Sequence, residues 1–221
     1  MHNRRCLLLK GEDVEHFLQG LISQDVSKLK IQECIYSLIL TPQGRYVSDV
    51  FIHKSSDLRG WILDIPTHKT LVIELFLQKY KMRRQIDIQR LNIPVRMDPT
   101  TGIKDPRHPD IGYRIYGDTF HTGDWYHNMR FDIGLPDDHD ILSNAIPLEI
   151  GLEMFNSIAF DKGCYLGQEF TAMTKYKKLN LKKLSVFNSD HLYKTLDTFN
   201  GGIVYSYHPY YQKGFYLHGR T

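Results

Sequence analysis

The order of the secondary-structure elements predicted for the first 91 residues constrains the fold most strongly. The pattern predicts a strand at 6–9, a helix at 11–23, strands at 34–41, 46–53 and 61–65, a helix at 69–82 and a strand at 86–91. Strands and helices do not alternate strictly, which argues against a Rossmann-like doubly wound sheet. The order favours an α+β fold with helices packed on a largely antiparallel sheet.

Hydrophobic spacing supports these assignments. In the first helix, apolar residues follow i, i+3, i+4, i+7 and i+8, which is one face of an amphipathic helix. They are Val14, Phe17, Leu18, Leu21 and Ile22. The segment 42–45 has the Pro and Gly residues of a turn, so the two strands beside it should form a hairpin.

The remainder of the chain suggests two further units. The segment 92–109 holds four prolines and a glycine, a density that predicts an exposed connection. Beyond it the pattern predicts a strand at 112–116, a helix at 124–133, and tyrosine-rich strands at 181–187, 203–207 and 214–218. We therefore expect a first lobe at 1–91, a second at 92–178 and a small C-terminal β element at 179–221.

Composition excludes several classes of protein. With 221 residues, 42% hydrophobic and 24% charged, the chain is typical of a folded globular protein. It has no apolar run near the roughly 20 residues that a membrane span needs. Three cysteines and no signal-peptide pattern predict a reducing compartment, with cytoplasm as the expected location, or the mitochondrial matrix in a eukaryote, although no transit peptide is seen.

Charge gives little guidance on the partner. The formal net charge is +3, a mild excess that suits an anionic ligand and does not mark a dedicated nucleic-acid binder. A lysine-rich run at 175–183 is the one feature typical of nucleic-acid binding, and a solvated edge next to an anionic cofactor explains it better. We therefore do not expect direct nucleic-acid or membrane binding.

One segment carries chemistry, because the common phosphate-loop, dinucleotide, zinc-protease and serine-hydrolase motifs are absent and the cysteines lack metal-binding spacing. Residues 162–169 read Lys-Gly-Cys-Tyr-Leu-Gly-Gln-Glu. Cys164 is expected where a turn enters a helix, so the helix dipole and Lys162 would favour its thiolate. Gly163 and Gly167 would allow a ligand or backbone to approach closely. Alternatively, Cys164 is a small buried hydrophobic residue.

The same segment resembles the signature of the YgfZ family, folate-binding proteins that support iron–sulfur enzymes and belong to the superfamily of the glycine-cleavage T-protein. Further blocks are similar to the family in the same order. They are residues 17–26, 40–45 with Asp49, 105–107, 112–114 and 146–152. The resemblance implies a T-protein-like cloverleaf of lobes around a central folate channel, here with a shortened C-terminal β lobe.

The resemblance also implies site residues. Cys164 would be the reactive residue. The cofactor-binding positions would be Lys162, Gly163, Tyr165, Gly167, Gln168, Glu169, Asp25, Arg45, Asp49 and Asp132. Asp132 falls where the T-protein has a pterin-holding glutamate, although it could equally be a solvated helix acid, and Arg45 could face the channel or cap a hairpin. The T-protein's paired aspartates read Ser48-Asp49 here, which argues against aminomethyl transfer.

The implied function is that of a tetrahydrofolate-binding accessory factor for assembly or repair of iron–sulfur clusters in client enzymes, including those that modify tRNA. Its partners would be folate and iron–sulfur client or assembly proteins, with a transient cluster on Cys164 and no resident metal. Two alternatives stay open. One is a folate-dependent one-carbon transferase, and the other is a tRNA or protein adaptor on an inactive transferase fold.

Overall fold

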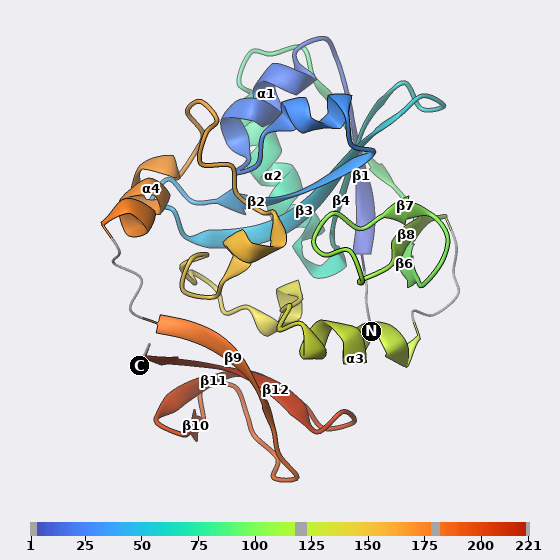
Figure 1. Ribbon diagram of the computed structural model, residues 1–221. Helices are drawn as coiled ribbons and strands as arrows, with labels where there is room; N and C mark the ends of the chain where they lie inside the picture. Colours follow the sequence, from blue (N-terminus) through green and yellow to red (C-terminus); the bar gives the residue numbers. More distant parts are fainter. Residues whose placement is uncertain (1–3, 118–122, 178–181, 220–221) are drawn as a thin grey trace.

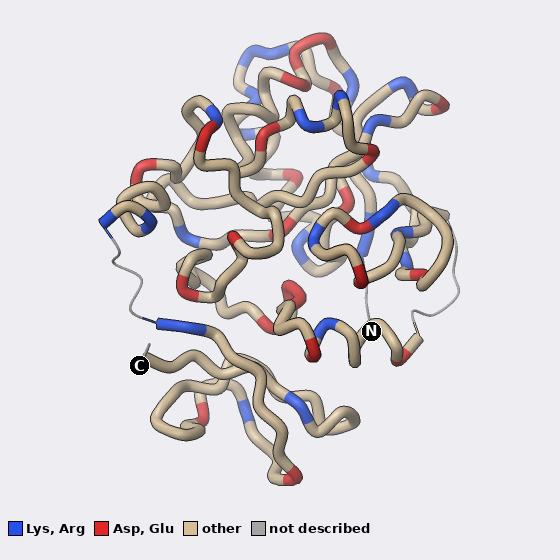
Figure 2. The backbone as a smooth tube through the Cα atoms, in the orientation of Figure 1, with Lys and Arg blue, Asp and Glu red and all other residues tan. Residues whose placement is uncertain are grey.

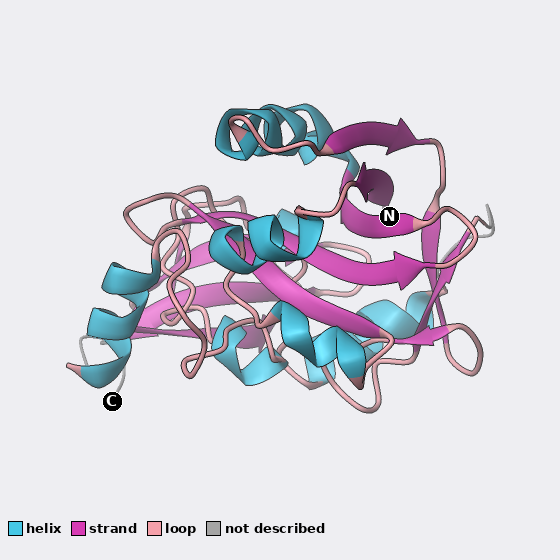
Figure 3. Ribbon diagram, turned by 90° about the horizontal axis from the view of Figure 1, so that it is seen from above, coloured by secondary structure: helices cyan, strands magenta, loops and turns pink. Residues whose placement is uncertain are grey.

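The structure is a computed structural model that describes residues 4–117, 123–177 and 182–219. Figure 1 shows α1 and the first sheet at one end of the molecule, the C-terminal sheet at the other, and α3 between them. From above, long strands run side by side across the middle of the molecule (Figure 3). Basic and acidic positions are interleaved along the whole chain, with no separation into two charged ends (Figure 2).

The first 91 residues form the predicted antiparallel sheet with its helices. The strand order is β2-β3-β4-β1-β5, and every neighbouring pair is antiparallel. The strands are β1 (Arg4–Lys10), β2 (Cys34–Leu40), β3 (Tyr46–Ser55), β4 (Gly60–Pro66) and β5 (Asp87–Leu91). The helices are α1 (Val14–Leu21) and α2 (Thr70–Lys81), with short 3-10 turns η1 (Val26–Lys30) and η2 (Thr67–Lys69). The predicted hairpin, both helices and the largely antiparallel sheet are confirmed.

This sheet is covered on both faces. On β2, Ile35 and Ile39 pack in the cluster that contains α1 and α2, whereas Tyr36 and Leu38 pack in a second cluster on the opposite face. Successive side chains of a strand point to opposite faces, so β2 can be buried along its whole length. The second face is the one against which residues 97–165 pack.

The segment 92–109 corrects the prediction of an exposed connection. It contains β6 (Val95–Asp98) and β7 (Ile103–Lys104), which pair with β8 (Tyr113–Tyr116) in a sheet of order β6-β8-β7. Met97, Asp105 and Arg107 are buried. The prolines and glycine stand mostly in the turns between very short strands, where Pro99, Gly102 and Pro109 are exposed. The helix breakers thus mark turns of a small folded sheet and not a connection without structure.

The second part continues with α3 (Asp124–Asp132), as predicted, and α4 (Gln168–Tyr176), with short turns η3 (Asp138–Asp140) and η4 (Leu152–Phe155). The C-terminal residues form a sheet of order β10-β11-β12-β9. Its strands are β9 (Lys182–Asn188), β10 (Thr198–Phe199), β11 (Gly202–His208) and β12 (Lys213–Gly219). The expected C-terminal β element is thus present.

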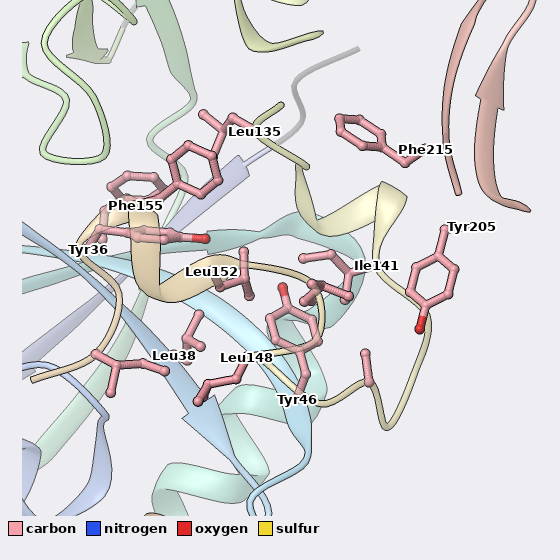
Figure 4. Close-up of a cluster of buried hydrophobic side chains, with 14 of the residues drawn as sticks. Tyr36, Leu38, Tyr46, Leu135, Ile141, Leu148, Leu152, Phe155, Tyr205 and Phe215 are labelled. Atoms are coloured by element: carbon pink, nitrogen blue, oxygen red, sulfur yellow. The ribbon is translucent and has the colours of Figure 1, made fainter. Parts of the chain in front are cut away.

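One apolar cluster joins all three parts of the chain. Tyr205 and Phe215 of the C-terminal sheet belong to the same cluster as Ile141 and Leu148 of the second part and Tyr46 of the first (Figure 4). The domain boundaries at 91 and 178 stay predictions, and residue 178 lies outside the described ranges.

Candidate functional site

The loop at 156–167 is fastened to the end of α1. Ala159 donates its backbone N–H to the Ser23 carbonyl at 3.0 Å, and Leu166 donates to the Gly20 carbonyl at 3.1 Å. The Ser23 hydroxyl donates to the Ser157 carbonyl at 2.6 Å. Two of the sequence blocks that carry the family resemblance, 17–26 and 162–169, therefore meet in space although about 140 residues separate them.

Lys162 is the centre of this contact. Its Nζ donates to the carbonyls of Gln19 at 2.7 Å, Ile22 at 2.8 Å and Gln24 at 3.0 Å. The side chain is 8% exposed, and burial lowers its pKa to about 8 while nearby Asp25 acts in the opposite direction. All three ammonium donors are used on the backbone, so Lys162 holds the loop in place and does not present its charge to a cofactor.

Cys164 lies on the surface of this loop. It is exposed, whereas the other two cysteines, Cys6 and Cys34, are buried and burial raises the pKa of both thiols. With Gly163 it borders an open hollow of about 420 Å³ whose walls include Phe17, Tyr80 and Arg84. The alternative of a buried Cys164 is therefore wrong.

The expected position of Cys164 at a helix start is also wrong. The cap of α4 is Gly167 and the helix begins at Gln168, four positions after Cys164. A helix terminus acts on charges within about one turn, so α4 is not placed to stabilise a thiolate at this sulfur. The pattern of the sequence could not show that residues 163–165, which belong to no helix or strand, precede the helix.

Gly167 explains one glycine of the motif. Its φ is +84°, and a Cβ atom there would lie 2.6 Å from the Thr41 carbonyl oxygen and 3.0 Å from the Gly44 Cα. The β2–β3 turn thus touches the start of α4, and Arg45 of that turn lies over the Phe170 ring at 5.3 Å. Gly163 has no neighbouring atom within 4 Å of such a Cβ, so only Gly167 makes the close backbone contact.

The other residues of the motif differ in exposure. Tyr165 is buried, which raises its pKa to about 12, and its ring lies 5.0 Å from the Lys162 Nζ. Gln168 is half-buried and Glu169 is exposed in the first turn of α4. Asp25 caps η1 by accepting from the Ser27 N–H at 2.9 Å. Burial would raise its pKa, but hydrogen bonds from Ser27 and Gln19 outweigh burial and lower it.

Asp49 and Asp132 lie apart from this loop. Asp49 is fully buried on β3 and accepts from the Arg4 Nη1 at 2.8 Å, and burial raises its pKa although Arg4 opposes the shift. The Asp132 side chain is 65% exposed at the end of α3, where it pairs with Lys213 at 3.1 Å. Neither acid therefore borders the hollow beside Cys164, and Asp132 borders a separate cavity of about 350 Å³.

A network of buried ion pairs crosses the interior, and sequence reasoning did not identify it as such. Its members are Arg4, Asp49, Asp64, Asp105, Arg107, Arg114, Arg130, Asp137 and Asp140. Arg114 joins Asp64 of β4 to Asp105, donating from Nε and Nη1 at 3.0 Å each. At the other end, Asp140 accepts from Arg130 and from His208 of β11, both at 2.6 Å.

Neighbouring arginines outweigh the effect of burial on three of the network's acids. Burial would raise the pKa of Asp64, Asp105 and Asp140, but the neighbouring arginines lower it below its ordinary value. Residues 105–107 and 112–114 are two of the blocks that resemble the family. Their charged residues are explained by the buried ion pairs that they form. The network links the first sheet, the second part and the C-terminal sheet.

A second cavity, of about 300 Å³, lies between η1, β2 and the segment 104–109. Its walls include the cationic side chains Lys28 and Lys104 together with His108 and Gln32. None of the predicted site residues borders it. Two of the blocks that carry the family resemblance border it, through Gln24 and through Asp105 and Pro106, but neither block indicates a cavity by itself, because the wall combines residues from distant segments.

Within the described ranges, no three His, Cys, Asp or Glu side chains are grouped so that they could hold a metal ion. Cys164 therefore belongs to no such group in the part of the chain that the structure describes. None of the helices in the described part of the chain is long and apolar enough to cross a membrane.

The amino-acid sequence of this chain is similar to those of several known proteins. The chain is 27% identical over 225 residues to an "Iron-sulfur cluster assembly factor IBA57 homolog, mitochondrial" of Neurospora crassa, an alignment that covers 82% of this chain and 51% of that protein. Its homologues are IBA57 iron–sulfur cluster assembly factors. The Mycosarcoma maydis IBA57 homolog is 28% identical over 219 residues, with 82% of this chain and 54% of that protein covered. Human IBA57 is 26% identical over 227 residues, with coverages of 83% and 64%.

These IBA57 relatives bear out the resemblance to the YgfZ family. The chain spans about half the length of the fungal relatives it matches. Their names place them in mitochondria, which does not support the expected cytoplasmic location. No protein-family model matches the chain.

A solved structure shows the fold. The glycine cleavage system aminomethyltransferase T from Bartonella henselae matches with a TM-score of 0.71 at 12% identity, covering 97% of this chain and 75% of that chain. The predicted T-protein-like α+β fold is therefore confirmed.

Proposed function

We propose that this chain acts in iron–sulfur cluster assembly and that the Cys164 sulfur is the atom that holds the cluster or its sulfur in transit. One observation carries the proposal. Cys164 is the exposed thiol of the three, and Lys162 fixes its loop through three backbone hydrogen bonds. A thiolate is the usual protein ligand of iron–sulfur clusters.

Cluster binding at Cys164 would be shared and reversible. Clusters usually take four cysteine ligands, and a single thiolate cannot enclose one, so a partner protein must provide the others. The thiol loses its proton when it binds iron, and the adjoining hollow leaves room for water to take that proton. A ligand held by one bond on an open surface can be passed on, as an assembly factor requires.

The proposal extends to clients and location. We include enzymes that modify tRNA among the clients, as the family resemblance implies, and we place the role in the mitochondrial matrix for a eukaryotic source, in line with the names of the relatives.

The test replaces the sulfur. Cys164→Ser should leave the free energy of unfolding within about 0.5 kcal/mol of the wild type, because the side chain is exposed. The same variant should lose cluster-dependent activity of client enzymes in cells. Cys6→Ala, which removes a buried thiol, is the control and should retain client activity. Full client activity in Cys164→Ser cells would refute the proposed role of the sulfur.

We propose separately that the chain binds tetrahydrofolate. Asp49 is buried in a pair with Arg4, and Asp132 borders a different cavity at the end of α3, so these two acids do not form one shared pterin site. The 300 Å³ cavity offers Lys28 and Lys104 for the anionic glutamate tail of a folate. Titration monitored by pterin fluorescence should show saturable binding that Lys104→Glu weakens. Equal binding by both proteins would exclude this cavity.

A further inference from the structure

Helix α2 leaves a second apolar face uncovered. Its buried residues are Ile73 and Leu77, which pack against the first sheet. On the opposite side Leu71 is 57% exposed, Val72 54% and Leu75 61%. Large aliphatic side chains grouped on one helix and exposed to this degree indicate a surface that another molecule covers.

This uncovered face continues to the hollow beside Cys164. Val72, Phe76 and Tyr80 follow each other at i, i+4 and i+8, so they form one ridge along the helix. The rings of Phe76 and Tyr80 are 4.6 Å apart, and Tyr80 borders the hollow together with Cys164. A protein that covered the face would therefore reach the sulfur.

The charge at this end of α2 selects the partner. Lys79 lies on the same face as Val72 and Leu75, and Arg83 and Arg84 follow the helix. Among the described residues, no carboxylate forms an ion pair with these three cations, whereas Glu74 on the same helix is already paired with Arg90. Unneutralised cations beside an apolar patch favour an acidic partner and disfavour a second copy of this basic surface.

We propose that the α2 face, defined as Leu71, Val72, Leu75, Phe76, Tyr80 and the cations Lys79, Arg83 and Arg84, docks an acidic iron–sulfur protein that supplies the remaining ligands of the cluster on Cys164. This inference rests on the proposed function. The apolar residues give the contact its affinity, and the cations orient an acidic surface toward the sulfur.

The experiment first identifies the partner and then measures it. The photo-reactive amino acid p-benzoylphenylalanine is placed at position 75 of the full chain in cells, and the cross-linked protein is identified by mass spectrometry. The expected result is an acidic protein that holds an iron–sulfur cluster when purified. A cross-link to RNA, to a second copy of the chain or to a protein without a cluster would overturn the inference, as would the absence of any cross-link.

The purified partner is then titrated against matched variants. Leu75→Glu and Arg84→Glu should each weaken binding about tenfold or more, and added salt should weaken wild-type binding. The control is Ile31→Glu, because Ile31 is 86% exposed on a different segment, and its affinity should equal that of the wild type. Equal affinities for Leu75→Glu and Ile31→Glu would overturn the docking surface.

The Cys164→Ser variant separates the two proposals. Partner binding retained with no cluster in the complex supports both of them. A cluster retained in Cys164→Ser, together with weak binding by Leu75→Glu, leaves the docking surface standing and removes the proposed role of the sulfur. Loss of the cluster in Cys164→Ser, with full binding by Leu75→Glu, does the reverse.

Discussion

The buried ion-pair network and the Cys164 loop use charge in opposite ways. In the network, each acid is paired with one or more arginines, as Asp64 and Asp105 are with Arg114. In the loop, the one buried cation, Lys162, is matched by backbone carbonyls. The network therefore holds the parts of the molecule together, whereas the loop leaves its sulfur exposed and without a hydrogen bond from the described residues.

The difference shows that a concentration of ionisable groups is not by itself a reactive site. Burial and complete pairing mark the network as structural, because unpaired buried charges are very costly. A group is available for reaction when hydrogen bonds of its neighbours hold it in place and it forms none itself. By this criterion Cys164 is the candidate, and Asp49 is not.

The largest expected effect breaks the network. Arg114→Met leaves Asp64 and Asp105 each short of one buried partner, so the free energy of unfolding should fall by about 3–5 kcal/mol. Urea denaturation measures it. Arg90→Met is the matched control, because Arg90 is 56% exposed in its pair with Glu74, and it should cost less than about 1 kcal/mol. Equal losses for the two variants would show that the buried network is not the stronger element.

A smaller effect tests the support of the loop. Gly167→Ala introduces a Cβ atom at φ +84° and 2.6 Å from the Thr41 carbonyl, so it should cost about 3 kcal/mol of unfolding free energy. Gly163→Ala, in the same loop, places its Cβ in open space and should cost less than about 1 kcal/mol. A stable Gly167→Ala protein would mean that the contact with the β2–β3 turn is not tight.

The smallest expected effect is a pH dependence of the free energy of unfolding that comes from His53. Burial lowers the pKa of His53 to about 4, and its Nδ1 has no hydrogen-bond partner among the described residues. The unfolded chain takes up this proton near pH 6.5, whereas the folded chain does so only near pH 4. The contribution of His53 to the free energy of unfolding is therefore fully present above about pH 6.5. It falls by about 2 kcal/mol between pH 7 and pH 5.

His53→Phe should remove that part of the pH dependence while keeping the ring contact with Tyr116, whose centroid lies 4.4 Å away. His191→Phe, on the exposed loop before β10, should leave the dependence unchanged. Denaturation at pH 7, 6 and 5 measures the slope, and an unchanged slope in His53→Phe would contradict the assignment.

Local patterns predicted the elements well and the pairings poorly. The spacing of Val14, Phe17 and Leu18 reports which face of α1 is buried, because helical periodicity is written in neighbouring residues. The pairing of Asp64 with Arg114 depends on how segments 50 residues apart meet, and no local pattern reports such a meeting. The prolines near Asp105 indicate turns, and turns alone do not reveal that Asp105 is buried.

The candidate site shows the same division. The motif at 162–169 singled out Cys164 and the close approach at Gly167, and both lie in one loop. The motif could not reveal that Lys162 turns inward, because its acceptors are carbonyls of residues 19–24. The positions of Asp49 and Asp132 came from family likeness, and the structure places them on separate elements.

The three bonds of Lys162 have a consequence for how such a chain can change over time. The location of the sulfur is set by the backbone path at the end of α1, so a substitution that shifts this turn moves the thiol as well. Substitutions in residues 19–24 and in the loop that carries Lys162 are therefore coupled, because a change in one segment keeps the sulfur in place only when the other segment changes to fit it.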